Sequence, residues 1–306
     1  MSTAWIYAGQ GSQAVGMGRD FYDVFPEVRD IFDSKAAGFD LRELCFDATA
    51  EELARTRCTQ PCMAAFAAAV TRVLRGLGYA PDYAAGLSLG EYSALHAAGV
   101  FGVETLLELL AFRGIAMEES AAGVESRMSA VLSLSEELVR QAVAESAHIG
   151  VVACTNINCP GQIVIGGELA AVLAAEERCA ALGARRCLPL NTSGPFHTPL
   201  MENASARLRE KFAATEFLPQ QIPVIFNATG EPAADGEIKH LLCEQVKSTV
   251  LFEKTLLKLA ALGADTVIEI GPGNALAGFV RKTVPDLRVV SVNNVGDLKK
   301  VVELWN

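Results

Sequence analysis

Ala85-Gly86-Leu87-Ser88-Leu89-Gly90-Glu91-Tyr92 is the stretch around which this chain is organised. It carries a Gly-x-Ser-x-Gly pattern between an apolar run at 82–86, which favours a strand, and a helical pattern at 89–98. A serine in that position sits on a sharp strand-to-helix turn, so its hydroxyl group is exposed. Glycines flank it because strand and helix cross where a side chain would collide. The stretch therefore predicts that Ser88 is a nucleophile.

Strands and helices alternate on both sides of this turn. Thr49, with Glu52 three residues later, marks the start of a short capped helix. Such alternation predicts an α/β fold with a mainly parallel sheet covered on both faces. Apolar runs predict further strands at 4–8, 222–227, 266–270 and 288–292, and helical spacing predicts helices at 20–37, 60–78, 103–120, 199–213, 236–246, 252–262, 274–282 and the chain end.

The pattern changes after Gly123. Residues 127–190 are predicted to run strand, helix, strand, strand, helix, strand, which is the ferredoxin-like order. We therefore expect a small ferredoxin-like subdomain at 125–195, inserted into a larger catalytic domain formed by residues 1–124 and 196–306.

Composition narrows the range of partners. The chain has 306 residues and a net charge of −10, with no Lys/Arg block longer than two residues, so no nucleic-acid partner is expected. Residues 1–5 lack the basic start of a secretory leader, and no apolar run is long enough to span a membrane. The eight cysteines form no Cys-x-x-Cys pair, which favours free thiols over disulfides or a metal site. We expect a cytoplasmic protein with no membrane partner.

Ser88 needs a base, because an unactivated serine is a poor nucleophile. Of the four histidines, His96 lies eight residues along the predicted helix, roughly 12 Å away and out of reach. His197 follows Gly194-Pro195-Phe196 in a rigid turn before a helix, where an imidazole can face a cleft. We expect His197 to be the base; the alternative is an ordinary histidine at a helix start. No nearby Asp or Glu stands out, so a backbone carbonyl or a side-chain amide is left to orient the ring.

The oxyanion of an acyl-transfer transition state needs hydrogen-bond donors. The backbone N–H of Leu89 is one candidate. The loop Gly9–Gln13 is another, because parallel strands bring the loops at their carboxyl ends together. Its Gly-x-Gly lacks the third glycine of a dinucleotide site, so no nucleotide cofactor is expected.

Arg113 lies in an otherwise apolar helical context, Leu109-Leu110-Ala111-Phe112-Arg113-Gly114. A buried guanidinium needs a carboxylate partner or a bound anion. Two interpretations stay open from the residues alone: a structural ion pair, or a clamp for a substrate carboxylate.

Seven motifs, in order and in register, give the chain its resemblance to malonyl-CoA:acyl carrier protein transacylases. Together they cover essentially the whole sequence. They are Gly9-Gln10-Gly11-Ser12-Gln13, Thr59-Gln60-Pro61, Gly86-Leu87-Ser88-Leu89-Gly90-Glu91-Tyr92-Ser93-Ala94-Leu95, Arg113-Gly114-x-x-Met117, Asn158-x-Pro160-Gly161-Gln162-x-Val164-Ile165, Gly194-Pro195-Phe196-His197-x-x-Leu200-Met201 and Ile270-Gly271-Pro272-Gly273.

The resemblance implies an α/β-hydrolase-like large domain with a ferredoxin-like small one, and a ping-pong reaction without a cofactor. Ser88, helped by His197, would attack malonyl-CoA, and the acyl-serine would pass to the phosphopantetheine thiol of acyl carrier protein. Arg113 matches the arginine that pairs with the malonyl carboxylate.

Further positions are matched by the same resemblance. Gln10 and Leu89 match the residues whose backbone amides form the oxyanion hole. Gln245 matches the residue that orients the histidine, and Gln60 matches a pocket-lining glutamine. Phe196, being bulky and next to the base, is expected to narrow the space at the acyl α-carbon and to disfavour methylmalonyl groups.

The sequence departs from the family pattern at three places. Leu87 replaces the histidine that often precedes the nucleophile, Ala8 replaces a proline, and Ser248-Thr249 replaces an Asn-Pro pair after Gln245. We expect these changes to tune the activity and leave the nucleophile, the base and the clamp in place.

Other functions share part of this pattern. An acyl hydrolase would use the same Ser88 and His197 but has no need of Arg113, and a non-catalytic docking subunit would need none of the three. The resemblance does not separate fatty-acid from polyketide synthesis. It implies a monomer, and because the carrier is acidic, Lys247, Arg281 and Lys282 are candidates for a local basic docking surface.

Overall fold

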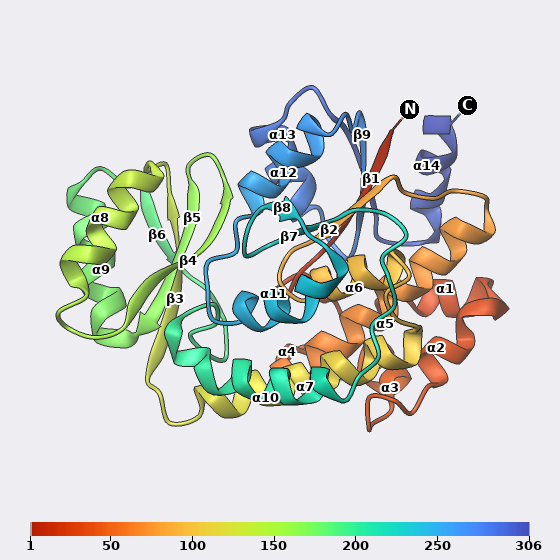
Figure 1. Cartoon of the computed structure of the whole chain (residues 1–306), viewed down its shortest axis with the longest axis horizontal. Coiled ribbons are helices and arrows are strands. Elements are labelled where there is room, and N and C mark those ends of the chain that lie inside the picture. The colour runs from red at the N-terminus through yellow and green to blue at the C-terminus, as the bar shows by residue number, and fades with distance from the viewer. Residues whose placement is uncertain (1, 306) are drawn as a thin grey trace.

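The large sheet lies at the centre of the computed structural model, which describes residues 2–305 (Figure 1). Its strand order is β10-β9-β1-β2-β7-β8, and every pairing is parallel except that of the short β8 with β7. The strands are β1 (Thr3–Tyr7), β2 (Tyr83–Gly86), β7 (Val224–Phe226), β8 (Glu231–Pro232), β9 (Thr266–Ile270) and β10 (Arg288–Val292).

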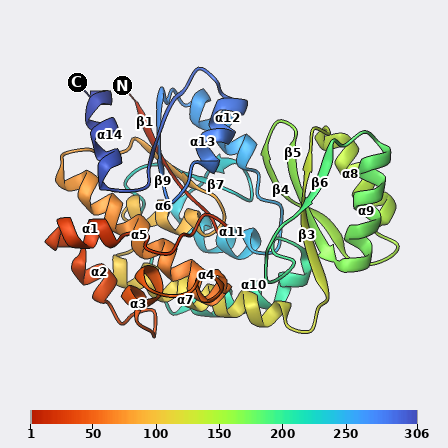
Figure 2. The ribbon, with the colours of Figure 1, turned by 180° about the vertical axis from the view of Figure 1, so that it is seen from behind.

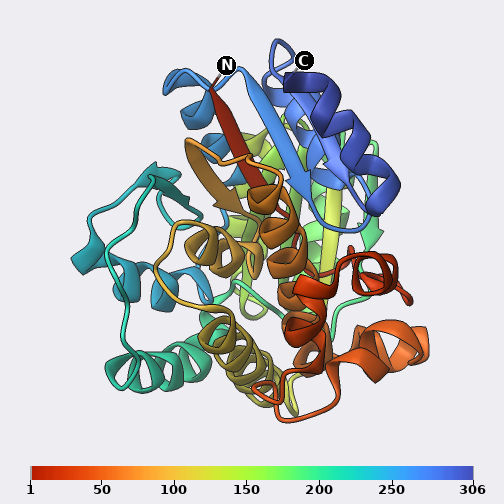
Figure 3. The same cartoon turned by 90° about the vertical axis from the view of Figure 1, so that its right-hand side faces the viewer.

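Helices cover both faces of this sheet, which explains why β1 and β9 are buried along their whole length. Helices α5, α6 and α14 contact one face and α12 and α13 the other (Figure 3). The helices of this larger part are α1 (Arg19–Val24), α2 (Arg29–Asp33), α3 (Leu41–Phe46), α4 (Ala50–Ala54), α5 (Thr56–Gly76), α6 (Gly90–Ala97), α7 (Val103–Ala121), α10 (Glu202–Ala213), α11 (Ile238–Gln245), α12 (Phe252–Ala261), α13 (Ala275–Thr283) and α14 (Leu298–Trp305).

A second, antiparallel sheet stands beside the first, in the order β4-β5-β3-β6. Helices α8 (Glu136–Ser146) and α9 (Leu169–Ala181) pack on its outer face (Figures 1 and 2). The inner face turns towards the large sheet. At the edge strand β4, Thr155 and Ile157 exchange backbone hydrogen bonds with Val250. The strands are β3 (Ser126–Leu132), β4 (Val152–Cys159), β5 (Gln162–Glu168) and β6 (Arg186–Pro189). The predicted α/β fold, a mainly parallel sheet with a separate antiparallel one, is confirmed.

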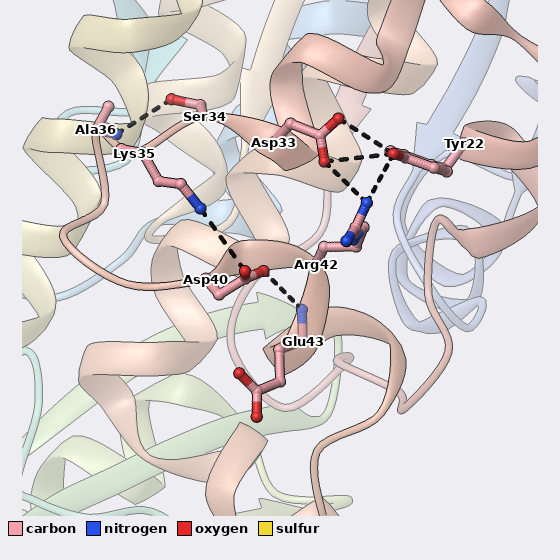
Figure 4. Close-up of polar contacts among 8 residues, drawn as sticks. All are labelled: Tyr22, Asp33, Ser34, Lys35, Ala36, Asp40, Arg42 and Glu43. Atoms are coloured by element: carbon pink, nitrogen blue, oxygen red, sulfur yellow. Dashed lines mark hydrogen bonds and ion pairs between the residues drawn. The ribbon is translucent and has the colours of Figure 1, made fainter.

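The single helix predicted at 20–37 is wrong. The segment is split into α1, a 3-10 turn at Pro26–Val28 and α2. Pro26 has no N–H to continue the helix and forces Phe25 into an extended conformation. The Ser34 hydroxyl then accepts a bond from the Ala36 N–H just beyond α2 (Figure 4).

Helix α3 was missed by the sequence analysis, although its signal is visible in retrospect. The carboxylate of Asp40 accepts the N–H of Glu43 and so caps the first turn (Figure 4). Arg42 on the same helix reaches the Tyr22 hydroxyl and Asp33, which fastens α3 to α1 and α2. At six residues α3 is too short for an apolar period to reveal it.

Candidate active site

Ser88 lies on the turn between β2 and α6, with a backbone φ of +56°. A Cβ on Gly86 would fall 2.0 Å from the carbonyl carbon of Gly90, and one on Gly90 would fall 2.2 Å from the Tyr7 oxygen. Only glycine fits at both places. A left-handed φ at a non-glycine residue costs about 1–3 kcal/mol, so the surrounding contacts must hold this turn in place.

His197, from the turn before α10, meets Ser88 directly. Its Nε2 lies 2.8 Å from Ser88 Oγ, and its Nδ1 lies 2.7 Å from the carbonyl oxygen of Gln245. A carbonyl oxygen only accepts, so Nδ1 carries the ring proton and Nε2 is left to accept the proton of the serine hydroxyl. His197 itself has a φ of +61°. Two residues 109 positions apart are thus held in one hydrogen bond by two strained turns.

The imidazole of His197 is neutral at physiological pH. Burial, together with the positive charge of Arg113, lowers the pKa of His197 to about 3, although the hydrogen bond to the Gln245 carbonyl acts in the opposite direction. A neutral ring is the form that can act as a base.

Arg113 projects from α7 to the same point and is fully buried. Its Nη1 donates to Gln60 Oε1 at 2.8 Å, and its Nη2 donates to Gln245 Oε1 at 2.8 Å and to Ser88 Oγ at 3.1 Å. The face of the Tyr92 ring lies 5.5 Å from the guanidinium carbon. These partners are all neutral, and within residues 2–305 Arg113 forms no ion pair with a carboxylate.

Glu91 is the acidic side chain whose charge would act on Arg113, but it does not neutralise the guanidinium. Burial raises the pKa of Glu91 to about 8, so this group is mostly protonated at neutral pH. The structural ion pair left open by the sequence is therefore not formed, and Arg113 remains a buried cation beside the nucleophile. Such a site favours a bound anion.

Gln245, at the end of α11, contributes with two different groups. Its backbone carbonyl accepts a hydrogen bond from His197 Nδ1–H, while its side-chain Nε2 donates to the carbonyl oxygen of Ser88 at 2.8 Å. Of the two ways to orient the ring that the sequence left open, the backbone carbonyl is the one found. The side-chain amide instead connects Arg113 to the turn at Ser88.

A cavity of about 420 Å³ opens at Ser88 between the two sheets. Ser88, His197 and Arg113 lie along its wall. Other side chains that line it include Gln10, Gln60, Leu87, Met117, Met128 and Phe196. A larger hollow of about 510 Å³, bounded by residues 14–20, Gly273 and Asn293, contains neither the serine nor the histidine, so the chemistry belongs to the smaller one.

The two backbone amides that the resemblance assigns to the oxyanion hole are those of Leu89 and Gln10. Neither the N–H of Leu89 nor that of Gln10 donates to a backbone carbonyl in the described part of the chain. The Gln10 side chain donates to Thr56 Oγ1 at 3.0 Å, and Thr56 in turn bonds to Ser193 Oγ at 2.5 Å, which steadies the Gln10 loop. The N–H of Ser88 is already occupied by Asn227.

Asn227, just after β7, is the site residue that sequence reasoning missed. Its Oδ1 accepts the N–H of Ser88 at 2.7 Å, and its Nδ2 donates to the carbonyl of Gly86 at 2.6 Å. Nothing in the local sequence marks it beyond its place at the end of a predicted strand.

The remaining histidines lie outside this cluster. His96 and His148 bond to the carbonyls of Phe101 and Glu145, and His240 is exposed. No group of three or more His, Cys, Asp or Glu residues within 2–305 is arranged to hold a metal ion. Over the same residues, no helix is both long and apolar enough to cross a bilayer.

Comparison with known proteins gives full-length matches. The model of the family described as acyl transferase domain matches residues 4–304. A malonyl CoA-acyl carrier protein transacylase from Bacillus subtilis is 37% identical over 304 residues, which cover 98% of this chain and 96% of that protein.

Solved structures of similar proteins agree with the fold. A crystal structure of MCAT from Streptococcus pneumoniae matches with a TM-score of 0.95 and 41% identity, over 99% of this chain and 100% of that one. A chain from the structure of a type II PKS acyl-carrier protein in complex with its malonyl-transacylase matches with a TM-score of 0.96 and 36% identity, over 99% of this chain and 100% of that one.

Proposed function

Because this chain belongs to the acyl transferase domain family, we propose that it moves a malonyl group from malonyl-CoA to the phosphopantetheine thiol of acyl carrier protein. The observation that carries the proposal is the buried, unpaired Arg113 only 3.1 Å from the hydroxyl of Ser88. The enzyme is an acyltransferase, and its product would supply fatty-acid or polyketide synthesis.

The first half-reaction forms an acyl-serine. Ser88 Oγ attacks the thioester carbonyl while its proton moves to Nε2 of His197, 2.8 Å away. The imidazolium that results keeps its Nδ1–H bond to the Gln245 carbonyl. The N–H groups of Leu89 and Gln10 would stabilise the oxyanion. On collapse the C–S bond breaks, and the proton on Nε2 is given to the departing sulfur of coenzyme A.

The second half-reaction reverses these steps with another thiol. His197 takes the proton of the phosphopantetheine thiol, the sulfur attacks the malonyl ester, and the proton returns to Ser88 Oγ. An ordinary serine ester and a thioester are exchanged, so no cofactor is required. We propose that the reaction proceeds without one.

Arg113 accounts for the choice of acyl group. In a malonyl-serine the free carboxylate is separated from the ester carbonyl by a single methylene, which keeps it within reach of a guanidinium that already contacts Oγ. A carboxylate there would form charge-assisted hydrogen bonds with a cation that has only neutral partners. An acyl group without the carboxylate would leave that buried cation unpaired.

The three basic residues proposed for carrier docking differ in whether their side chains are already paired. Lys247 is held between Glu202 and Glu244, whereas Arg281 and Lys282 are exposed at the end of α13. We propose that Arg281 and Lys282 contribute to the surface that meets the acidic carrier protein, with the chain acting as a monomer in the cytoplasm. The eight free thiols fit a reducing compartment.

The proposal is tested by offering malonyl-, methylmalonyl-, acetyl- and succinyl-CoA to the protein with and without phosphopantetheinylated acyl carrier protein. Intact-mass spectrometry follows the acyl-enzyme, the acylated carrier and free acid. We expect malonyl transfer to dominate and the acyl-enzyme to be lost in Ser88→Ala. Accumulation of free malonate in place of malonyl-carrier would indicate a hydrolase, and wild-type transfer by Ser88→Ala would refute the scheme.

A further inference from the structure

We propose that Asn227 is a positioning residue, whose side-chain amide holds the turn at Ser88 in its reactive conformation. The inference deepens the proposed function and rests on it for the natural substrate. It starts from the place where the pairing of β2 with β7 stops.

The side chain of Asn227 replaces a missing piece of the sheet. Strands β2 and β7 pair in parallel at Ala84 with Val224 and at Ala85 with Ile225. The same register would set residue 227 opposite residue 87, with its backbone N–H on the Gly86 carbonyl and its carbonyl on the Ser88 N–H. Both bonds are present, but the side-chain amide makes them, at 2.6 and 2.7 Å.

The backbone of Asn227 is engaged elsewhere, which leaves the side chain free to reach the turn. Its N–H donates to Glu91 Oε2 at 2.5 Å, and its carbonyl accepts the N–H of Leu251 at 2.8 Å. Asn227 is fully buried, and each of its four polar groups has a partner. Such a saturated residue has one available conformation, so it fixes what it touches.

The amide acts on the strained part of the turn. Gly86 and Ser88 flank Leu87, and Ser88 has the left-handed φ of +56°. Asn227 binds the Ser88 N–H on one side while Gln245 Nε2 binds the Ser88 carbonyl on the other. Without the amide the turn can relax towards ordinary φ values, which moves Oγ away from His197 Nε2. The same contact removes the Ser88 N–H as an oxyanion donor and leaves that task to the next amide, at Leu89.

Two substitutions separate the parts of this contact. Asn227→Leu is close in size and removes both hydrogen bonds. Asn227→Asp keeps an acceptor for the Ser88 N–H but has no donor for the Gly86 carbonyl when ionised. Thr229→Val is the matched control, because Thr229 lies in the same turn after β7 and its hydroxyl bonds only to Glu231.

Two rates are measured for each protein, together with the thermal midpoint. The first is labelling of Ser88 by a fluorophosphonate, which needs the reactive serine but not a malonyl group. The second is formation of malonyl-enzyme from malonyl-CoA, resolved into maximal rate and half-saturating concentration. If wild type is labelled but forms no malonyl-enzyme, the proposed function fails while the labelling comparison still tests Asn227.

We expect Asn227→Leu to lower both rates about 100-fold, with the half-saturating concentration changed by less than about threefold. Both rates of Asn227→Asp should lie between those of Asn227→Leu and wild type, and both rates of Thr229→Val should equal those of wild type. Labelling of folded Asn227→Leu at the wild-type rate would overturn the proposal. So would equal slowing by Thr229→Val, which a general loss of stability would produce. If Asn227→Leu does not fold, wild-type labelling of Asn227→Asp is the overturning result.

Discussion

Replacing Arg113 by alanine should change which acyl group the protein prefers. The guanidinium is fully buried and has three neutral partners, Gln60, Gln245 and Ser88. In Arg113→Ala a bound malonyl carboxylate would lie in the same buried place without a cation. An acetyl group has no carboxylate to pair with Arg113, so the rate of acetyl transfer should change little.

The size of the effect follows from this burial. Removing one partner of a buried ion pair costs about 3–5 kcal/mol, which corresponds to a loss of roughly 150- to 5000-fold in kcat/KM for malonyl-CoA. For acetyl-CoA we expect kcat/KM to change by less than about threefold, because an acetyl group forms no ion pair with Arg113. The loss of the bonds to Gln60 and Gln245 affects both substrates alike and does not change their ratio. The malonyl-to-acetyl ratio should therefore fall by about 100-fold or more.

The assay is competition between malonyl-CoA and acetyl-CoA for limiting carrier protein, with both products counted by mass. Arg113→Lys keeps the charge without the two-pronged geometry and should fall between wild type and Arg113→Ala. Met117→Leu alters the wall of the same cavity without touching its charge and should leave the ratio unchanged. A ratio within about twofold of wild type in folded Arg113→Ala would refute the clamp.

Three further outcomes follow from the same site. Phe196→Ala should raise the rate with methylmalonyl-CoA relative to malonyl-CoA by about tenfold, because Phe196 lines the cavity beside the base and narrows the space at the acyl α-carbon. An unchanged ratio of the two rates in the competition assay would contradict this prediction. The pKa of His197 is lowered from 6.5 to about 3, so the imidazole should stay neutral as the pH falls below 6.5. Fluorophosphonate labelling of Ser88 should therefore stay fast over that range. A ¹⁵N titration of the ring with a midpoint at or above 6.5 would contradict this prediction. Glu91 has a folded pKa of about 8, above its usual 4.5, so its stabilisation is full below pH 4.5 and is lost as the pH rises towards 8, by about 1.4 kcal/mol per unit. Urea unfolding at pH 6.0 and 7.5 should show this slope in wild type and a shallower one in Glu91→Gln, and equal slopes would refute the assignment.

Much of the fold follows from the sequence because its signals are local. The strands predicted at 266–270 and 288–292 have the bounds that the structure gives, since each is rich in valine and isoleucine and is bounded by turn residues. The turn at Ser88 was visible because two glycines must flank it at fixed spacing. The split of the 20–37 segment also has a local signal, Pro26, but apolar residues at helical spacing continue on both sides of it.

The sequence by itself determined the family, the α/β fold class and the three side chains that meet at the cavity, Ser88, His197 and Arg113. Only the tertiary structure decided what surrounds them. Asn227 lies 139 positions from Ser88, and Gln245 contacts His197 through a backbone carbonyl, a group that every residue possesses. Such contacts have no sequence signature. The neutral imidazole and the unpaired guanidinium arise from desolvation, and desolvation is set by packing between segments that are far apart in the chain.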